Sequence, residues 1–193
     1  EFNLKIEKFN KSGALFDIIK LDDMCKEYMA KLTASEVYDM AIEWSKKYDS
    51  ELYSRLSSNK EFCIDILNIE RTGEKIRKDI VKLSDVKEQL SIFFDDTLGN
   101  PEDISGRVEE SKQVEILNEY INVFNIDDSQ EEWFEKIKQL SSKLGFEKVG
   151  DVAMVIRVAV TGRTRTPDLY QVIKVLGRDR VLGRLEKYVG LMV

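Results

Sequence analysis

The 193-residue sequence contains no histidine. This absence excludes Ser-His-Asp and Cys-His catalysis, metal sites built on histidine ligands, and a histidine pH switch. Any reaction carried out by this chain would have to use carboxylate, lysine, tyrosine or cysteine side chains.

Turn-forming residues and cysteines are also scarce. The chain has two prolines and ten glycines, which favours long helices over many short strands. Its two cysteines, Cys25 and Cys63, lie in segments with helical apolar spacing and form no C-x-x-C motif, so we interpret them as reduced core thiols rather than redox or metal-binding groups.

Long apolar runs are missing as well. No run approaches the roughly 18 residues that a membrane span needs, and no secretory signal is present. The sequence begins at Glu1 rather than at methionine, which suggests a piece of a longer or processed protein.

Apolar residues recur at helical spacing along most of the chain, and no segment alternates as a strand would over a useful length. T-x-x-E at Thr33 and S-x-x-E at Ser129 predict capped helix starts, and Ser84 can cap a third. We therefore predict an all-α protein of two small helical subdomains, with a break at residues 95–106. The expected helices lie around residues 21–32, 37–48, 51–58, 60–70, 73–82, 85–94, 114–124, 133–144, 151–160, 166–176 and 179–188.

Three pairs of adjacent acids, Asp22-Asp23, Asp95-Asp96 and Asp127-Asp128, are the main candidates for carboxylate chemistry. Neighbours on a helix point about 100° apart, so such pairs do not converge on one site. We interpret them as helix-capping or solvated residues. The sequence also has no phosphate-binding loop, EF-hand or dinucleotide-binding turn, so we predict no catalytic residue and no metal site.

The charge is unevenly distributed. Residues 151–193 hold eight basic and four acidic residues, a net charge of +4, whereas the remainder holds 22 basic and 32 acidic residues, a net charge of −10. A basic end on an acidic body suggests a polyanionic partner on one side, although such a charge is also common on helical surfaces.

The segment VTGRTRTPDLYQVI, residues 160–173, concentrates this basic character between two expected helices. Gly162 suits the left-handed end of the first helix, and Thr166-Pro167 suits the start of the second. Capping does not explain Arg157, Arg163 or Arg165. They could form a donor-rich concavity for phosphates or unstacked bases, or lie in a solvated loop or pair with Asp151 or Asp168.

Two segments resemble bacterial-type glutamyl-tRNA synthetases. The C-terminal end of that family has R-x-A-x-T-G, a short hinge, T/G-P-x-L-F/Y-x-I/V-x-x-x-L-G and a final R-x-L helix, which is similar to RVAVTGRTRTPDLYQVIKVLGRDRVLGRLEKYV at residues 157–189. The family segment S-K-S-x-x-x-F-D-x-x-K-L-x-x-x-N-x-x-Y is similar to KFNKSGALFDIIKLDDMCKEYM at residues 8–29. Weaker similarities are GDVAM and ISGRVEES. The resemblance covers both ends of the chain in the right order, with a divergent middle.

The resemblance implies the C-terminal, anticodon-binding half of such an enzyme, without the catalytic Rossmann domain. Residues 1–30 would be the tail of the stem-contact region, 31–98 the first helical anticodon-binding subdomain and 99–193 the second. The ATP-binding signatures of the family are missing here, so this chain would have no cofactor of its own and would not charge tRNA, while ATP and Mg would bind in the parent enzyme. The implied partners are a glutamate-acceptor tRNA and the upstream catalytic domain of the same protein, in a cytoplasmic monomer with no membrane contact.

The resemblance also implies roles for single residues. Arg157 would hydrogen-bond an anticodon base edge or phosphate, and Thr166 and the backbone near Leu169 would contact the neighbouring base, with Pro167 fixing the turn. Arg163 and Arg165 would contact phosphates, which position rather than specify. The first subdomain has Asp79 where the family often has an arginine, and the candidate substitutes are Arg77, Lys78 and Lys82.

Two other hypotheses come from the composition. A helical protein-interaction module without nucleic-acid binding would have its C-terminal arginines neutralised by internal Asp or Glu. A carboxylate enzyme would need converging acids, and the spacing of the acid pairs argues against it.

Overall fold

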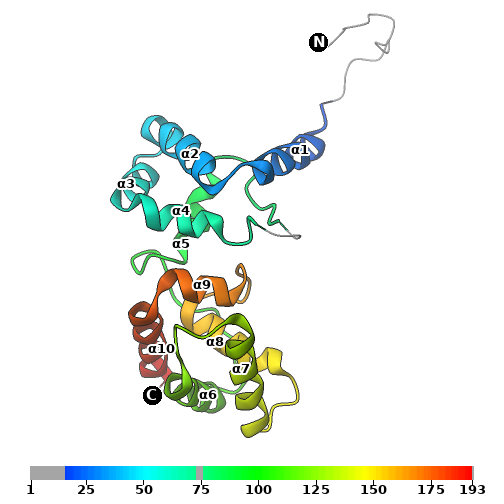
Figure 1. Cartoon of the computed structure of the whole chain (residues 1–193), viewed down its shortest axis with the longest axis vertical. Coiled ribbons are helices and arrows are strands. Elements are labelled where there is room, and N and C mark those ends of the chain that lie inside the picture. The colour runs from blue at the N-terminus through cyan, green and yellow to red at the C-terminus, as the bar shows by residue number, and fades with distance from the viewer. Residues whose placement is uncertain (1–15, 73–75, 193) are drawn as a thin grey trace, which may run out of the picture.

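The computed structural model describes residues 16–72 and 76–192. Every regular element within these residues is an α-helix (Figure 1), which confirms the predicted all-α fold. Residues 8–15 of the N-terminal motif, and part of the expected helix at 73–82, lie outside the described residues. In the described part of the chain, no helix is both long and apolar enough to cross a bilayer. The helices are α1 (Ile18–Lys31), α2 (Ala34–Tyr48), α3 (Ser50–Ser58), α4 (Lys60–Asn68), α5 (Asp85–Ser91), α6 (Glu110–Val123), α7 (Gln130–Lys143), α8 (Val149–Thr161), α9 (Leu169–Leu176) and α10 (Arg178–Met192).

The first helix group consists of α2–α5. The predicted capping box starts α2, because Thr33 Oγ1 accepts from the Glu36 N–H at 3.2 Å and the Glu36 carboxylate accepts from the Thr33 N–H at 2.7 Å. Helix α2 packs against α3 and α4. Val37, Leu52 and Leu56 are fully buried in this group.

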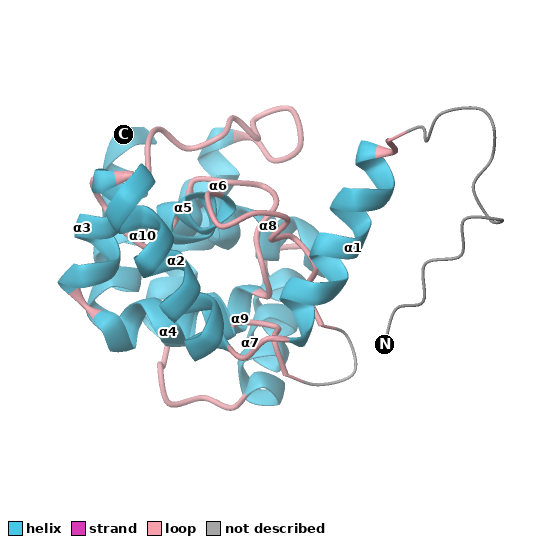
Figure 2. Ribbon diagram, turned by 90° about the horizontal axis from the view of Figure 1, so that it is seen from above, coloured by secondary structure: helices cyan, strands magenta, loops and turns pink. Residues whose placement is uncertain are grey.

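Helix α1 lies apart from the other helices (Figures 1 and 2). Asp17 caps its start, which lies three residues before the expected one. The apolar face expected over residues 21–32 is exposed at three positions: the exposed fraction is 42% for Leu21, 62% for Met24 and 57% for Tyr28. Helical periodicity correctly predicts the helix here, but the expected burial is found only at its C-terminal end, where Met29 is 6% exposed and belongs to the core.

The expected helix at 73–82 is wrong over the described residues. Residues 76–80 have no regular structure and 81–84 form a bend and a turn. Helix α5 is shorter than expected, and Ser84 makes no capping hydrogen bond. Asp85 instead accepts from the N–H groups of Val81 and Lys82, both at 3.0 Å, which fixes the turn before α5.

The second helix group consists of α6–α10. Helix α8 packs against α6, α7 and α10, and seven of its 13 residues are buried. The predicted capping box at Ser129 and Glu132 starts α7. The two groups contact each other through α4 and α9, and their buried residues form one continuous core. The boundary at 98/99 falls in the segment between α5 and α6 and stays a prediction.

Two adjacent acids tie that segment to both groups. Asp96 accepts two hydrogen bonds from Arg55 of α3, at 3.0 and 2.8 Å, and Asp95 pairs with Arg184 of α10 at 2.8 Å. Both side chains are exposed, Asp95 by 66% and Asp96 by 70%, as their interpretation as solvated residues expects, but each also pairs with an arginine, which the sequence did not suggest. The expectation that adjacent carboxylates do not converge holds, because they bind arginines on different helices.

Candidate nucleic-acid interface

The hinge, residues 162–168, connects α8 to α9. Helix α8 ends at Gly162, whose φ of 73° is left-handed as predicted. The N-cap of α9 is Asp168, which accepts from the Gln171 N–H at 3.0 Å. The predicted helix start at Thr166-Pro167 was therefore wrong. The Asp168 carboxylate satisfies the first turn, and Pro167 precedes the cap.

Gly162 is expected to resist substitution. A Cβ at this position would lie 3.2 Å from the Leu98 carbonyl oxygen, whereas at Gly145, which has a similar φ of 74°, it would meet nothing within 4 Å. We expect Gly162→Ala to lower the free energy of unfolding by more than the roughly 1–2 kcal/mol that the left-handed conformation alone costs, measured by urea denaturation. Gly145→Ala is the matched control, and equal losses for the two variants would show that the approach to Leu98 is unimportant.

The segment before α6 also contacts the hinge. The Glu102 carboxylate accepts from the Thr164 N–H at 2.8 Å and from the Thr164 hydroxyl at 2.6 Å. These hydrogen bonds hold the pKa of Glu102 below its usual value. The Gly162 carbonyl accepts from the Glu102 N–H at 2.8 Å. The hinge is therefore a fixed structure rather than a loose connection.

Arg157 of α8 is bonded to the hinge. Its Nη1 donates to the Thr166 hydroxyl, to the Thr166 carbonyl at 3.4 Å and to the Pro167 carbonyl at 3.1 Å. Burial lowers the pKa of Arg157, and the nearby carboxylates of Asp168 and Glu70 oppose this effect. Nη1 is fully used by the hinge, whereas Nε and Nη2 have no hydrogen-bond partner in the described chain.

The first helix group holds the hinge through Glu70. Its carboxylate accepts from the Asp168 N–H at 3.1 Å, and its own N–H donates to Gln171 Oε1 at 3.0 Å. Glu70 has a φ of 53°, a conformation that a non-glycine residue adopts at a cost unless its surroundings impose it. These contacts link the end of α4 to the start of α9.

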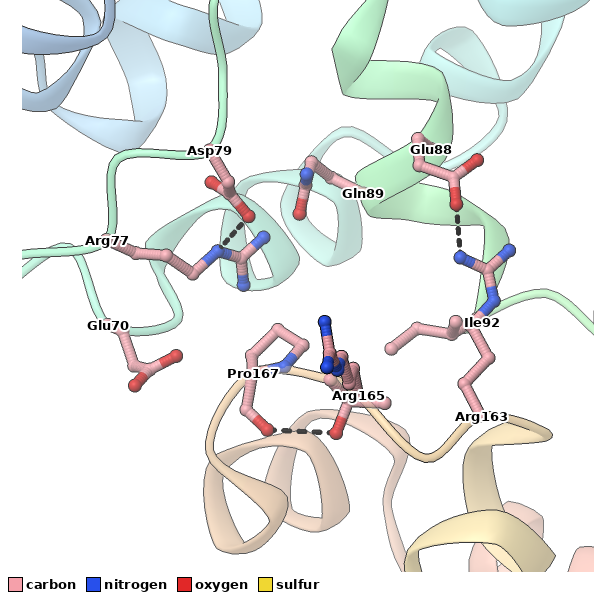
Figure 3. Close-up of a pocket in the computed structure, with 10 residues that line it drawn as sticks. Glu70, Arg77, Asp79, Glu88, Gln89, Ile92, Arg163, Arg165 and Pro167 are labelled. Carbon is pink, nitrogen blue, oxygen red and sulfur yellow. Dashed lines mark hydrogen bonds and ion pairs between the residues drawn. The ribbon is translucent and has the colours of Figure 1, made fainter. Parts of the chain in front are cut away.

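A pocket of about 410 Å³ opens between the hinge and the first helix group (Figure 3). We call it the hinge pocket. Arg163 pairs with Glu88 and also donates to the Ser91 hydroxyl at 3.2 Å. Arg77 pairs with Asp79 on the other side of the pocket, and Arg165 lies between the two pairs. Its lining residues are Glu70, Arg77, Asp79, Glu88, Gln89, Ile92, Arg163, Arg165, Thr166 and Pro167.

A second pocket, of about 420 Å³, lies on the α7 side of the hinge. We call it the aromatic pocket. Arg157 and Leu169 line it, with Phe134 exposed by 47% and Trp133 beside it. Its full lining is Gln130, Glu131, Trp133, Phe134, Ile137, Ala153, Arg157, Asp168 and Leu169.

The structure divides the predicted site residues between these pockets. Thr166, Pro167, Arg163 and Arg165 line the hinge pocket, together with Arg77, whereas Arg157 and Leu169 line the aromatic pocket. The remaining two candidates, Lys78 and Lys82, line neither pocket. Lys78 pairs with Glu27 of α1 at 2.6 Å, and Lys82 is exposed.

No ion pair joins Arg157, Arg163 or Arg165 to Asp151 or Asp168 in the described chain, although the Asp168 carboxylate lies close enough to Arg157 to affect its pKa. Asp151 pairs with Arg107 at 2.7 Å, and the Asp168 carboxylate caps α9. The acidic partner of Arg163 is Glu88 of the first helix group instead. Sequence reasoning also missed Phe134, which lines the aromatic pocket. The only signal for it is an aromatic residue directly after the buried Trp133, on the polar side of an amphipathic helix.

Comparisons with known proteins agree with the resemblance seen in the sequence. A family model described as "Anticodon binding domain" matches residues 23–189. A glutamate–tRNA ligase from Acetivibrio thermocellus is 32% identical over 202 residues, covering 97% of this chain and 37% of that protein. One from Clostridium beijerinckii is 32% identical over 213 residues, covering 99% and 38%, and one from Sorangium cellulosum is 32% identical over 204 residues, covering 97% and 36%. The chain therefore spans about 37% of the length of such relatives.

Proposed function

The chain belongs to the anticodon binding domain family, and from this premise we propose that it binds the anticodon arm of a tRNA through the hinge and its two pockets. The observation that carries the proposal is the position of the hinge. It lies between two pockets of about 410 and 420 Å³ that its own residues line, within the usual size range of small-ligand sites. Two neighbouring unstacked bases could enter from either side.

The two pockets offer different chemistry to a base. The aromatic pocket combines the exposed ring of Phe134 with the free Nε and Nη2 of Arg157 and the apolar side chain of Leu169. Aromatic rings stack on unpaired bases, and guanidinium groups donate to their edges or to phosphates. The hinge pocket offers Arg165, whose guanidinium has no ion pair within the described residues, beside the ion-paired Arg163.

We further propose that the tRNA is a glutamate acceptor, because the curated relatives are glutamate–tRNA ligases. ATP and Mg would bind in a catalytic domain of a longer parent protein, and this chain would act as a monomer that binds tRNA in the cytoplasm without catalysing its charging. The complete lack of histidine supports the last point, because the family's first ATP-binding signature contains that residue. We expect this chain to bind tRNA but to form no glutamyl-adenylate from glutamate and ATP.

The alternative, a protein-interaction module, is favoured by one observation. Three arginines and three acids line the hinge pocket, so the pocket has no formal net charge. Membership of the family favours RNA as the ligand. The charge balance then predicts fewer phosphate contacts than a wholly basic surface would make. The RNA affinity should therefore fall less steeply with salt concentration than it would for such a surface.

Glu88 competes with RNA for Arg163 in this account. We expect Glu88→Gln to release the guanidinium and to tighten tRNA binding about two- to fivefold, since an exposed ion pair is worth about 0.2–1 kcal/mol. Fluorescence anisotropy at fixed salt measures the change. Glu115→Gln, which breaks an exposed pair with Lys112 on α6, is the matched control. Unchanged or weaker binding by Glu88→Gln alone would show that Arg163 does not contact the RNA.

Amide hydrogen exchange of the 193-residue chain, with and without a saturating tRNA transcript carrying a glutamate anticodon, tests the proposed function. We expect slower exchange in residues 162–168 and 130–137, which contribute to the two pockets, and unchanged exchange in residues 112–118 of α6. Protection confined to other surfaces, or a failure to bind the transcript, would contradict the proposal.

A further inference from the structure

Arg184 of α10 is a charged residue in the core between the two helix groups, with an exposed fraction of 5%. Its Nη1 donates to the carbonyl oxygens of Ile92 and Val160, both at 2.7 Å. Its Nε donates to Asp95 Oδ1 at 2.9 Å, and Nη2 lies 2.8 Å from the same oxygen as an ion pair. We call these four residues the Arg184 network.

Both carbonyl groups belong to helix ends. Ile92 is the C-cap of α5, and Val160 lies in the last turn of α8. The last four carbonyl groups of a helix have no partner within the helix, and the aligned peptide dipoles give that end a partial negative charge. The Arg184 guanidinium therefore lies where two such ends meet. This arrangement compensates for the burial of its charge.

The two helix ends lead directly to the walls of the hinge pocket. Ile92 is itself a lining residue of the pocket. Val160 lies three residues before Arg163, which lines the pocket from the hinge, and only Thr161 and Gly162 separate them. One planar guanidinium thus links the first helix group, at α5, to the start of the hinge.

We infer that Arg184 is a positioning residue for the hinge pocket, which sets the distance between its two walls. Arg184 does not line the pocket, and the Ile92 backbone is its only hydrogen-bond partner among the described lining residues, so it acts through α5 and α8 rather than on a ligand. The inference about pocket geometry rests on the structure alone. Its effect on RNA binding rests on the proposed function.

Lysine cannot replace arginine here. A single ammonium group on a flexible stem lacks the planar fork that lets one guanidinium reach two carbonyls and a carboxylate. Arg184→Lys therefore keeps the charge but should loosen the link between the helix groups. Asp95→Asn removes the ion pair and leaves both carbonyl contacts. Because the Asp95 side chain is exposed, we expect this variant to fold.

The test measures the distance between the helix groups by pulsed electron resonance in the 193-residue chain. Spin labels are placed at Glu43→Cys on α2 and Gln139→Cys on α7, in a Cys25→Ser background. We expect Arg184→Lys to broaden or shift the distance distribution and to weaken binding of a stem-loop RNA with the glutamate anticodon about tenfold, a size typical of mutations that act between sites. Asp95→Asn should have smaller effects in the same direction.

Arg178→Lys, at an exposed position on the same helix, is the control. One contrary outcome is that Arg184→Lys lowers the melting temperature yet leaves the distance distribution and the RNA affinity unchanged when both are measured well below that temperature. Arg184 would then only stabilise the fold, and the inference would be overturned. An unchanged distribution in Asp95→Asn would overturn it if Arg184→Lys does not fold. If the wild-type chain does not bind RNA, the proposed function fails, while the distance measurement still decides the positioning role.

Discussion

Arg184→Ala is expected to lower the free energy of unfolding by about 3–5 kcal/mol, the largest effect we predict for any substitution in this chain. The variant leaves the Ile92 and Val160 carbonyl oxygens without their buried donor, and a hydrogen bond from a charged donor is worth about 1.5–3 kcal/mol. The ion pair with Asp95 contributes less to this loss, because the Asp95 side chain is 66% exposed and exposed pairs contribute about 0–1 kcal/mol.

Urea denaturation followed by circular dichroism measures this loss. Arg178→Ala, on the exposed face at the start of α10, should stay within about 0.5 kcal/mol of the wild type. A loss below 1 kcal/mol for Arg184→Ala would show that water replaces the guanidinium at both carbonyls, and would remove the basis for the link between the two helix groups.

Arg157→Ala is expected to cost about 1–3 kcal/mol in binding to a stem-loop RNA with the glutamate anticodon, and to reduce discrimination between anticodons. Two causes add in this variant. The substitution removes a guanidinium from the lining of the aromatic pocket, and it also removes the three hydrogen bonds that hold Thr166 and Pro167. Arg157→Lys keeps a charge without the fork and should restore little of the affinity.

Fluorescence anisotropy titration measures the change in affinity. Arg107→Ala is the control, because Arg107 pairs with Asp151 at the opposite end of α8 and its side chain is 46% exposed. If Arg157→Ala bound the RNA like the wild type, or if Arg107→Ala lost as much affinity, the aromatic pocket would not be the base-binding site.

Local signals in the sequence predicted much of the secondary structure. Capping boxes at Thr33 and Ser129 and the left-handed Gly162 depend on residues within four positions of each other, and all three are present. Apolar periodicity fails to predict the secondary structure where hydrogen bonds from residues outside the segment determine it. The 73–82 segment has helical apolar spacing, yet Asp85 bonds the Val81 and Lys82 N–H groups and a turn forms instead.

The hinge was identified from sequence because its arginines are unusual between two apolar helices. Its detailed contacts were not predictable. Asp168 rather than Thr166 caps α9, and the Thr166 hydroxyl accepts instead from Arg157 of α8. The partners of Arg163 and Arg184 lie 75 and 89 residues away in sequence, at Glu88 and Asp95. No local pattern encodes such pairs, since they depend on how the two helix groups pack.

The ratio of two affinities tests the central claim most directly. The 193-residue chain is titrated with a stem-loop RNA carrying a glutamate anticodon and with the same stem-loop in which the three anticodon bases are replaced. Binding in the two pockets predicts at least about tenfold tighter binding of the first RNA, equal to about 1.4 kcal/mol. Equal affinities for the two RNAs would contradict the claim that the hinge recognises anticodon bases.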